Sequence, residues 1–173
     1  MNLLRILLSL VVTIGIGTTI FAQNETIVQA TVLDSDSTQA DKFYNIGIGK
    51  MSQRQFEASI SDFNQAIQLK PGFEQAYYNR GVCRFELKDY KGAILDFDSS
   101  LALTQNPDSY FSKGQTLYSL GDVEGAMLNY SKAIEIDKEH AQAYYYRGGI
   151  KFENADYASA ISDYDAAIAL KKS

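Results

Sequence analysis

The chain has 173 residues, 46% of them apolar, and its 16 Lys and Arg residues against 21 Asp and Glu residues give a net charge of −5. The apolar share excludes wholesale disorder, and the acidic balance argues against sequence-independent nucleic-acid binding and against electrostatic docking on an anionic membrane. One cysteine and one histidine are too few for an internal disulfide or a tetrahedral Cys/His metal site.

The first 22 residues have the layout of a secretory signal peptide. Arg5 lies beside the charged amino terminus, and an uncharged apolar stretch ending in a small residue covers residues 6–22. Gly15 and Gly17 weaken a helix there, which favours a cleaved signal over a permanent span. The ending Phe-Ala-Gln resembles that of exported bacterial proteins. We therefore predict a periplasmic or secreted protein with no membrane contact after cleavage. The alternative is an N-terminal membrane anchor, since ~17 apolar residues are the lower limit for a span.

Residues 23–39 are predicted to form a polar linker with at most one short ordered turn. Their few apolar residues keep neither helical nor strand spacing for long. The stretch Asp-Ser-Asp-Ser-Thr-Gln at residues 34–39 is a loop signal.

From residue 40 the chain repeats itself in four copies. A glycine recurs at intervals of 34, 33 and 34 residues, and an aromatic residue further along each copy follows the same intervals. The two series are Gly47, Gly81, Gly114 and Gly148, and Phe63, Phe97, Tyr130 and Tyr164. Both series lose one residue between the second and third copies, so we predict a deletion in the turn that connects them. A fixed period of this length indicates a stacked repeat architecture.

Each copy divides into two helical stretches, helix A and helix B. In the second copy, apolar spacing predicts helix A from about Glu74 to Leu87 and helix B from about Tyr90 to Leu103. Aspartates precede helix B in three copies and are predicted N-caps, at Asp89, Asp122 and Asp156. Asn106 before Pro107 is the corresponding signal for a helix A.

The repeated glycine lies in the middle of helix A, where it costs up to ~1 kcal/mol relative to alanine. We expect a close approach of helix B to offset this cost. Helix B carries small residues at two repeated positions, so we predict small-against-small packing within each hairpin. These residues are Ser59, Ala93, Ala126 and Ala160 at the first position, and Ala66, Ser100, Ala133 and Ala167 at the second.

This pattern resembles the tetratricopeptide repeat, in which a large residue, a glycine four later, an Ala-x-x-x-aromatic segment and a further alanine recur. The second copy has Tyr77, Gly81, Ala93, Phe97 and Ser100 at these positions. The proline that often ends a repeat is missing in three copies. The resemblance covers residues 40–173. It implies an all-α, right-handed superhelical solenoid of four helix-turn-helix repeats, at residues 40–73, 74–106, 107–140 and 141–173, with helix A lining a concave face.

In this family, one face of helix A lines the concave groove, so the resemblance implies a site for a peptide or protein segment. Aromatic side chains with polar tips suit such a partner. The candidate groove residues are Tyr44, Asn45, Tyr78, Asn79, Phe85, Phe111, Tyr118, Tyr145, Tyr146 and Phe152. The alternative is that these side chains are scaffold, packed between neighbouring repeats. Some members grip the C-terminal carboxylate of a chaperone with Lys and Asn; here those places in the first copy hold Tyr44 and Ile48, so that clamp is absent.

Basic residues stand where the family usually has an apolar residue before the glycine, at Arg80, Lys113 and Arg147. Aspartates stand just before the helix B aromatic residue, at Asp62, Asp96 and Asp163. A partly buried guanidinium needs a compensating charge. We therefore predict that these basic residues pair with these carboxylates between adjacent helices.

No catalytic constellation appears in the sequence. Cys83 lies in the middle of a helix A and is predicted to be a packed thiol, while His140 lies in a turn and is predicted to be exposed. Carboxylates two residues apart on one helix diverge, which is poor geometry for hydrolysis. We therefore predict a non-enzymatic scaffold with no cofactor and no nucleic-acid partner, which binds a protein or peptide outside the cytoplasm.

The alternative function is structural self-association. A repeat array usually needs a polar capping element, whereas the last helix B carries Ile161 and Ile168 on its outer face. A homodimer through the last repeat would cover them.

Overall fold

The computed structural model describes residues 36–171. The predicted signal peptide, residues 1–22, and linker residues 23–35 lie outside the described residues. The chain divides into two compact units, Met1–Gln39 and Ala40–Ser173, and the second unit contains the repeats.

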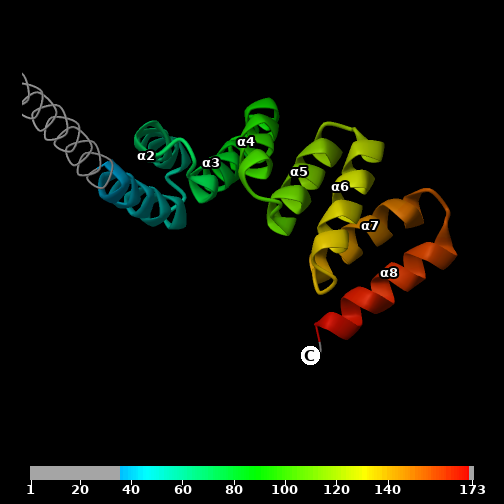
Figure 1. Cartoon of the computed structure of the whole chain (residues 1–173). Helices are drawn as coiled ribbons and strands as arrows, with labels where there is room; N and C mark the ends of the chain where they lie inside the picture. Colours follow the sequence, from blue (N-terminus) through cyan, green and yellow to red (C-terminus); the bar gives the residue numbers. More distant parts are fainter. Residues whose placement is uncertain (1–35, 172–173) are drawn as a thin grey trace, which may run out of the picture. The chain divides into compact units, whose positions relative to one another are not determined.

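Helices alternate with short turns in the second unit, and no strand occurs between residues 36 and 171. Residues 36–52 are helical. The helices that follow are α2 (Phe56–Leu69), α3 (Glu74–Glu86), α4 (Tyr90–Leu103), α5 (Pro107–Ser119), α6 (Val123–Ile136), α7 (Ala141–Glu153) and α8 (Tyr157–Leu170). Odd-numbered helices correspond to helix A and even-numbered helices to helix B. Each helix packs against the next along the chain (Figure 1), which confirms the predicted all-α solenoid of helix hairpins.

The first helix begins earlier than predicted. Residues 36–39, which belong to the predicted linker 23–39, are helical, so the linker prediction is corrected at these four residues. Adding a turn to an existing helix gains one hydrogen bond for each residue that is fixed. This gain outweighs the weak helix propensity of Asp36, Ser37 and Thr38.

The turns between hairpins explain the uneven repeat spacing. Four residues, 70–73, join α2 to α3, and four, 137–140, join α6 to α7, but only three, 104–106, join α4 to α5. The predicted deletion in the connecting turn is therefore confirmed, and the helices on either side keep their lengths.

Side-chain caps begin most of the helices. Asp89, Asp122 and Asp156 accept hydrogen bonds from the backbone N–H groups at the starts of α4, α6 and α8, as predicted. Asn106 caps α5 in the same way. His140 caps α7 through Nδ1, 3.2 Å from the nitrogen of Ala143. The prediction that His140 is exposed is wrong: it is 8% exposed, because its ring packs on that of Phe111 at 5.0 Å between centroids.

The close approach within each hairpin places an aromatic ring over the glycine. A Cβ added to Gly81 would lie 2.8 Å from Phe97, and one added to Gly114 would lie 2.7 Å from Tyr130. The predicted small residues are fully buried beside this contact, and Ser59 Oγ donates to the Gly47 carbonyl at 2.6 Å. The contact is therefore glycine against an aromatic ring, flanked by small residues, rather than small against small alone.

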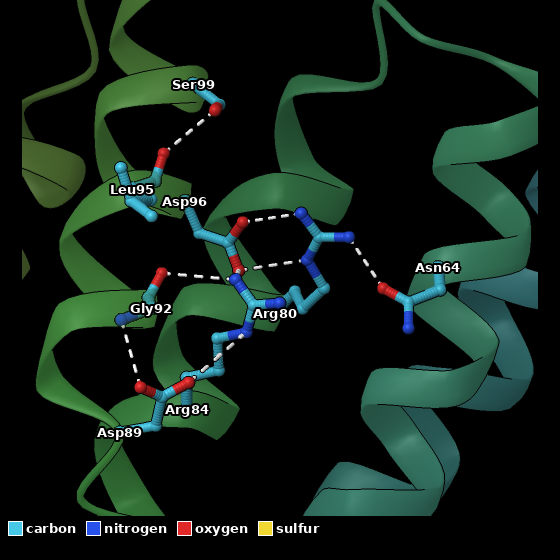
Figure 2. A network of polar contacts seen from close by, with 8 residues as sticks. All are labelled: Asn64, Arg80, Arg84, Asp89, Gly92, Leu95, Asp96 and Ser99. Carbon is cyan, nitrogen blue, oxygen red and sulfur yellow. Dashed lines mark hydrogen bonds and ion pairs between the residues drawn. The ribbon is translucent and has the colours of Figure 1, made fainter.

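Arg80 connects three helices of two hairpins (Figure 2). Its Nε and Nη2 donate to the two carboxylate oxygens of Asp96 on α4, at 2.9 and 2.6 Å. Its Nη1 donates to Asn64 on α2 at 2.6 Å. Arg84 adds a second guanidinium 2.9 Å from Asp96, which is 1% exposed. Two positive charges thus compensate one buried carboxylate, which satisfies the electrostatic requirement for burying it.

The same arrangement recurs at the last hairpin. Arg147 on α7 donates to both oxygens of Asp163 on α8, at 2.8 and 2.7 Å, and to Ser131 on α6 at 3.1 Å. Lys151 lies 2.8 Å from the same carboxylate. The predicted pairing is confirmed for Arg80 and Arg147.

Two of the predicted residues, Lys113 and Asp62, do not take part in the predicted pairing. Lys113 contacts Asp98 on the preceding helix at 2.6 Å, because the third hairpin has Asn129 where the others have aspartate, and its amide donates to the backbone within its own helix. Asp62 pairs with Lys50 at 2.6 Å, since Ile46 occupies the position of Arg80 in the first copy.

We predict that Gly81→Leu lowers the free energy of unfolding by about 1–3 kcal/mol or more. The added side chain must displace the ring of Phe97, which already lies in contact distance of the backbone. Gly49→Ala is the control, because a Cβ there meets no atom within 4 Å, and it should gain up to ~1 kcal/mol from helix propensity. Urea denaturation measures both; equal effects of the two substitutions would contradict the packing.

A second prediction concerns the turn inside each hairpin, where one residue adopts a left-handed conformation. These residues are Arg54, Lys88, Gly121 and Ala155, with φ of 59°, 62°, 84° and 61°. A residue with a side chain is strained in this conformation, so Ala155→Gly and Lys88→Gly should each raise the free energy of unfolding by about 1 kcal/mol. Gly121→Ala should lower it by a similar amount. Opposite signs in thermal unfolding support this geometry, and a loss of stability in both glycine variants would refute it.

A third prediction concerns acid sensitivity. Burial raises the pKa of Asp163, but hydrogen bonds from Arg147 and Lys151 outweigh burial and hold this pKa below its usual value. The unfolded chain therefore binds a proton more readily. The ionised carboxylate contributes stability above about pH 4, and that contribution is lost as the pH falls through the lowered pKa.

Asp163→Asn is therefore expected to flatten the acid limb of the stability curve, as measured by urea unfolding from about pH 6 to pH 2. Asp165→Asn, on the exposed side of the same helix, is the control and should keep the wild-type acid limb. If the stability of Asp163→Asn fell with pH as steeply as that of the wild type, Arg147 and Lys151 would not be holding the Asp163 carboxylate ionised.

Candidate functional site

Two hollows open along the odd-numbered helices of the second unit. The first has a volume of about 310 Å³ and lies between α3 and α5, with Phe97 of α4 and Gln142 of α7 also on its wall. Its other lining residues are Tyr78, Val82, Phe85, Glu86, Asp108, Phe111, Ser112 and Gln115. The i, i+4, i+7 spacing along each helix A places these side chains on one face.

The second hollow, of about 190 Å³, lies between α5 and α7. Its lining residues are Tyr118, Tyr130, Tyr145, Tyr146, Gly149, Ile150, Glu153 and Tyr164. We refer to the two hollows together as the A-helix groove. Aromatic rings dominate its walls, and the three charged residues that line it, Glu86, Asp108 and Glu153, are all acidic.

Six of the predicted groove residues line these hollows, namely Tyr78, Phe85, Phe111, Tyr118, Tyr145 and Tyr146. Their availability differs. Tyr145 is 58% exposed, whereas Phe111 is only 7% exposed because Tyr130, His140 and Tyr146 surround its ring. Phe111 therefore forms the floor of the groove, and Tyr118, Tyr145 and Tyr146 form its accessible wall.

The other four predicted residues lie outside the hollows. Asn79 donates to the hydroxyl of Tyr44 at 3.0 Å, and the ring of Tyr44 packs on Phe73 at 4.8 Å, so both residues tie the first two hairpins together. Phe152 is exposed and packs edge-on against Tyr157. Asn45 is exposed on the first helix.

The acidic rim was not among the predicted site residues. Glu86 and Glu153 each follow a predicted aromatic residue directly in the sequence, and Asp108 lies in the first turn of α5. The sequence alone indicates only that these acidic residues are solvent-exposed. The packing of neighbouring hairpins against one another brings them to one groove. Their shared sign was visible in the sequence, but their proximity was not.

The hydroxyls of Tyr78 and Tyr118 in the groove stay protonated near neutral pH. A hydrogen bond from Tyr118 to Glu153, at 2.8 Å, raises the pKa of Tyr118 and connects α5 to α7. Burial raises the pKa of Tyr78, whose hydroxyl lies 3.5 Å from that of Ser112. Tyr118 therefore keeps its proton in the hydrogen bond to Glu153, Tyr78 presents a neutral hydroxyl beside apolar rings, and the carboxylates supply the negative charge.

Cys83 does not line this groove. Cys83 is fully buried, and burial raises the pKa of its thiol, in agreement with the predicted packed role. Between residues 36 and 171, no three His, Cys, Asp or Glu side chains are placed to hold a metal ion. The helices of this described part are all too short or too polar to cross a membrane.

Comparison with solved structures shows the fold. A crystal structure of MamA has a TM-score of 0.73 and 22% identity, with 83% of this chain and 84% of that chain covered. MamA 41-end from Desulfovibrio magneticus RS-1 has a TM-score of 0.70 and 19% identity over 77% and 76% of the chains. The first TPR of Spaghetti (RPAP3), bound to HSP90 peptide SRMEEVD, has a TM-score of 0.66 and 21% identity over 69% and 95%.

Comparison by sequence gives a consistent result. No curated protein matches the chain. A family model described as tetratricopeptide repeat matches residues 44–110, and one described as TPR repeat matches residues 114–154, so the two together cover more than half of the chain. Tetratricopeptide repeat proteins generally mediate protein–protein interactions. With its four hairpins in one register, the chain belongs to the tetratricopeptide repeat family.

Proposed function

We propose that this protein is a non-enzymatic scaffold whose A-helix groove binds a partner segment that carries basic side chains among apolar or aromatic ones. One observation carries the proposal: the groove is walled by tyrosine and phenylalanine, and its charged lining residues are all carboxylates. A lysine or arginine would find compensating charge and aromatic faces there, both of which attract cations.

The geometry favours an extended segment over a compact ligand. The two hollows follow one another from α3 to α7, and Gln115 and Ser112 place polar groups between the aromatic rings. Such polar groups can pair with the main chain of a peptide, while the rings contact its side chains. Preformed helices keep these groups in place without ordering a loop, which reduces the entropic cost of binding.

The acidic rim disfavours an acidic partner segment. The RPAP3 repeat is bound to a peptide with the sequence SRMEEVD. In this chain, Glu86, Asp108 and Glu153 would repel carboxylates. This agrees with the absence of the carboxylate clamp, of whose Lys and Asn pattern only Asn79 matches in this chain. The proposed partner is therefore of the opposite charge.

We propose further that this binding takes place outside the cytoplasm. The signal-like arrangement of residues 1–22 supports this location. Amino-terminal sequencing of the protein from a fractionated bacterial expression host tests it. A mature chain beginning at Gln23 in the soluble envelope fraction is expected, whereas an intact amino terminus on cytoplasmic protein would refute export.

The groove is tested with two synthetic peptides that differ only in charge, one alternating tyrosine with lysine and the other alternating tyrosine with glutamate. The lysine peptide should bind and the glutamate peptide should not, as measured by fluorescence anisotropy of labelled peptides. Tyr118→Ala and Tyr78→Ala should each weaken binding by about tenfold or more. Glu153→Gln and Asp108→Asn should each weaken it by about two- to fivefold, less at high salt.

Tyr157→Ala is the matched control, because Tyr157 is 55% exposed but lies outside both hollows. It should leave binding unchanged, and circular dichroism should show equal helicity in all variants. Equal binding of both peptides would contradict the charge preference. Unchanged binding after both groove tyrosines are removed would exclude the groove itself.

A further inference from the structure

Each inner hairpin of the array is covered by the helix that follows it. Leu101 on α4 and Ile134 on α6 are 8% and 5% exposed, whereas Ile168, at the same repeat position on α8, is 51% exposed. Likewise Phe111 on α5 is 7% exposed, but its equivalent Tyr145 on α7 is 58% exposed. No helix follows α8 within the described residues, so these two apolar side chains lack the cover that their equivalents have.

The uncovered surface is a formed groove. It has a volume of about 620 Å³ between α7 and α8. We call it the terminal seat; its lining residues are Ala141, Gln142, Tyr145, Tyr146, Tyr164, Ala167, Ile168 and Lys171. In the hairpin before it, the equivalent residues Phe111, Tyr130, Ala133 and Ile134 form one buried cluster with Ala143 of α7. The seat therefore has the chemistry of an inner junction, with no helix over it between residues 36 and 171.

The inner junctions show which helix fits such a seat. α3, α5 and α7 each bring a small residue that is 0% exposed, then a tyrosine, then a basic residue four positions after the small one. These triplets are Ala76, Tyr77 and Arg80, then Ser109, Tyr110 and Lys113, then Ala143, Tyr144 and Arg147. The small residue lets the backbone of its helix approach the preceding hairpin closely. Its complete burial shows that the two surfaces are in contact there.

The basic residue of each triplet reaches back to the same position of the preceding helix B. Arg80 donates to Asn64 at 2.6 Å, Lys113 to Asp98 at 2.6 Å, and Arg147 to Ser131 at 3.1 Å. The equivalent residue on α8 is Asp165, which is exposed and makes no hydrogen bond or ion pair with any residue between 36 and 171. An exposed carboxylate thus stands where the basic residue of an incoming helix would arrive.

Neither a second copy of these 173 residues nor residues 1–35 supply a helix of this pattern. A head-to-tail second copy would present its first helix, residues 40–52, in which Lys42 and Ile46 hold the small and basic positions of the triplet. Lys42 would have to enter a position that is fully buried at the inner junctions, where an unpaired charge is costly. Ile46 would face Asp165. Residues 1–35 contain a single basic residue, Arg5, with no small residue four positions before it.

We propose that the terminal seat binds an amphipathic helix of a partner protein that carries a small residue, a tyrosine directly after it and an arginine or lysine four positions after the small residue. The helix would pack along α7 and α8 as α7 packs on α5 and α6, with its basic residue on Asp165. The seat adjoins the A-helix groove and shares Gln142, Tyr145, Tyr146 and Tyr164 with it. Ile168 and Asp165 line neither hollow of the groove, so substitutions at these two residues test the seat independently of the proposed function.

The array provides its own probe for the test. A synthetic peptide of residues 137–153 contains α7 with its cap and its triplet, and it is added, labelled, to the full 173-residue chain. Binding is measured by fluorescence anisotropy, and peptide helicity by circular dichroism, because a helix of this length is marginal alone. Saturable binding with a gain of helicity is expected. The same peptide with Ala143→Leu should not bind.

Charge reversal tests the register. Asp165→Lys in the chain should weaken binding of the peptide by about tenfold, and an Arg147→Glu peptide should bind this variant better than it binds the wild type. Ile168→Asp should abolish binding. Ser162→Lys is the control: it also places a lysine on α8, but at the position of Leu95 and Leu128, which are 66% and 62% exposed in the inner hairpins.

Three outcomes overturn the proposal. Binding that is insensitive to both Ile168→Asp and Asp165→Lys would place the peptide elsewhere. Failure of the peptide to bind a chain that is folded by circular dichroism would show that the seat does not accept a helix in trans. A chain dimer in sedimentation that Ile168→Asp dissociates would assign the seat to a second copy. Recovery of affinity by the charge-reversed pair supports the proposal, since a general loss of folding cannot restore binding.

Discussion

The structure depends on one repeated constraint: a helix hairpin of this sequence cannot bury its own apolar face, so the first helix of the next hairpin must complete it. Within a hairpin, the aromatic ring of helix B closes over the glycine of helix A, at Gly81 and Phe97 for example. Between hairpins, a small residue and a basic residue of the next helix A pack against the two helices of the preceding hairpin. Stability in such an array is the sum of neighbouring contacts.

The buried carboxylates follow from the same constraint. Asp96 and Asp163 lie inside hairpins at 1% and 4% exposure, each between two basic side chains. One of the two, Arg80 or Arg147, also contacts the preceding hairpin. One guanidinium therefore fixes both the angle within a hairpin and the step between hairpins. The third hairpin has Asn129 and Leu117 in place of this network, and there Lys113 makes only the contact between hairpins.

Much of the fold follows from periodicity alone. The intervals between Gly47, Gly81, Gly114 and Gly148 locate every hairpin and even the shortened turn, because a repeat that stacks on copies of itself must keep its register. Contacts between copies are harder to predict. The partner of Lys113 and the burial of His140 depend on which residue the neighbouring copy places opposite, and a pattern within one copy carries no information about that.

The candidate site shows the same division. The aromatic residues of the groove could be found from helix A spacing, although Phe111 lies beneath His140 and Tyr146 rather than at the surface. The acidic rim, and the residues that the groove shares with the terminal seat, could not be found in this way. Both arise from the three-dimensional facing of hairpins, in which residues about 33 positions apart in sequence become neighbours.

Native-state hydrogen exchange, resolved helix by helix, tests the central claim most directly. If each hairpin is stabilised by the helix that follows it, the opening free energy measured by hydrogen exchange should be lowest in α8 among helices α3 to α8. It should be higher in α6, and highest in α4 and α5. The terminal helix would then exchange by local opening, while the inner helices approach global unfolding. Equal protection of α8 and α4 would contradict the account, because it would mean that a hairpin is stable without its neighbour.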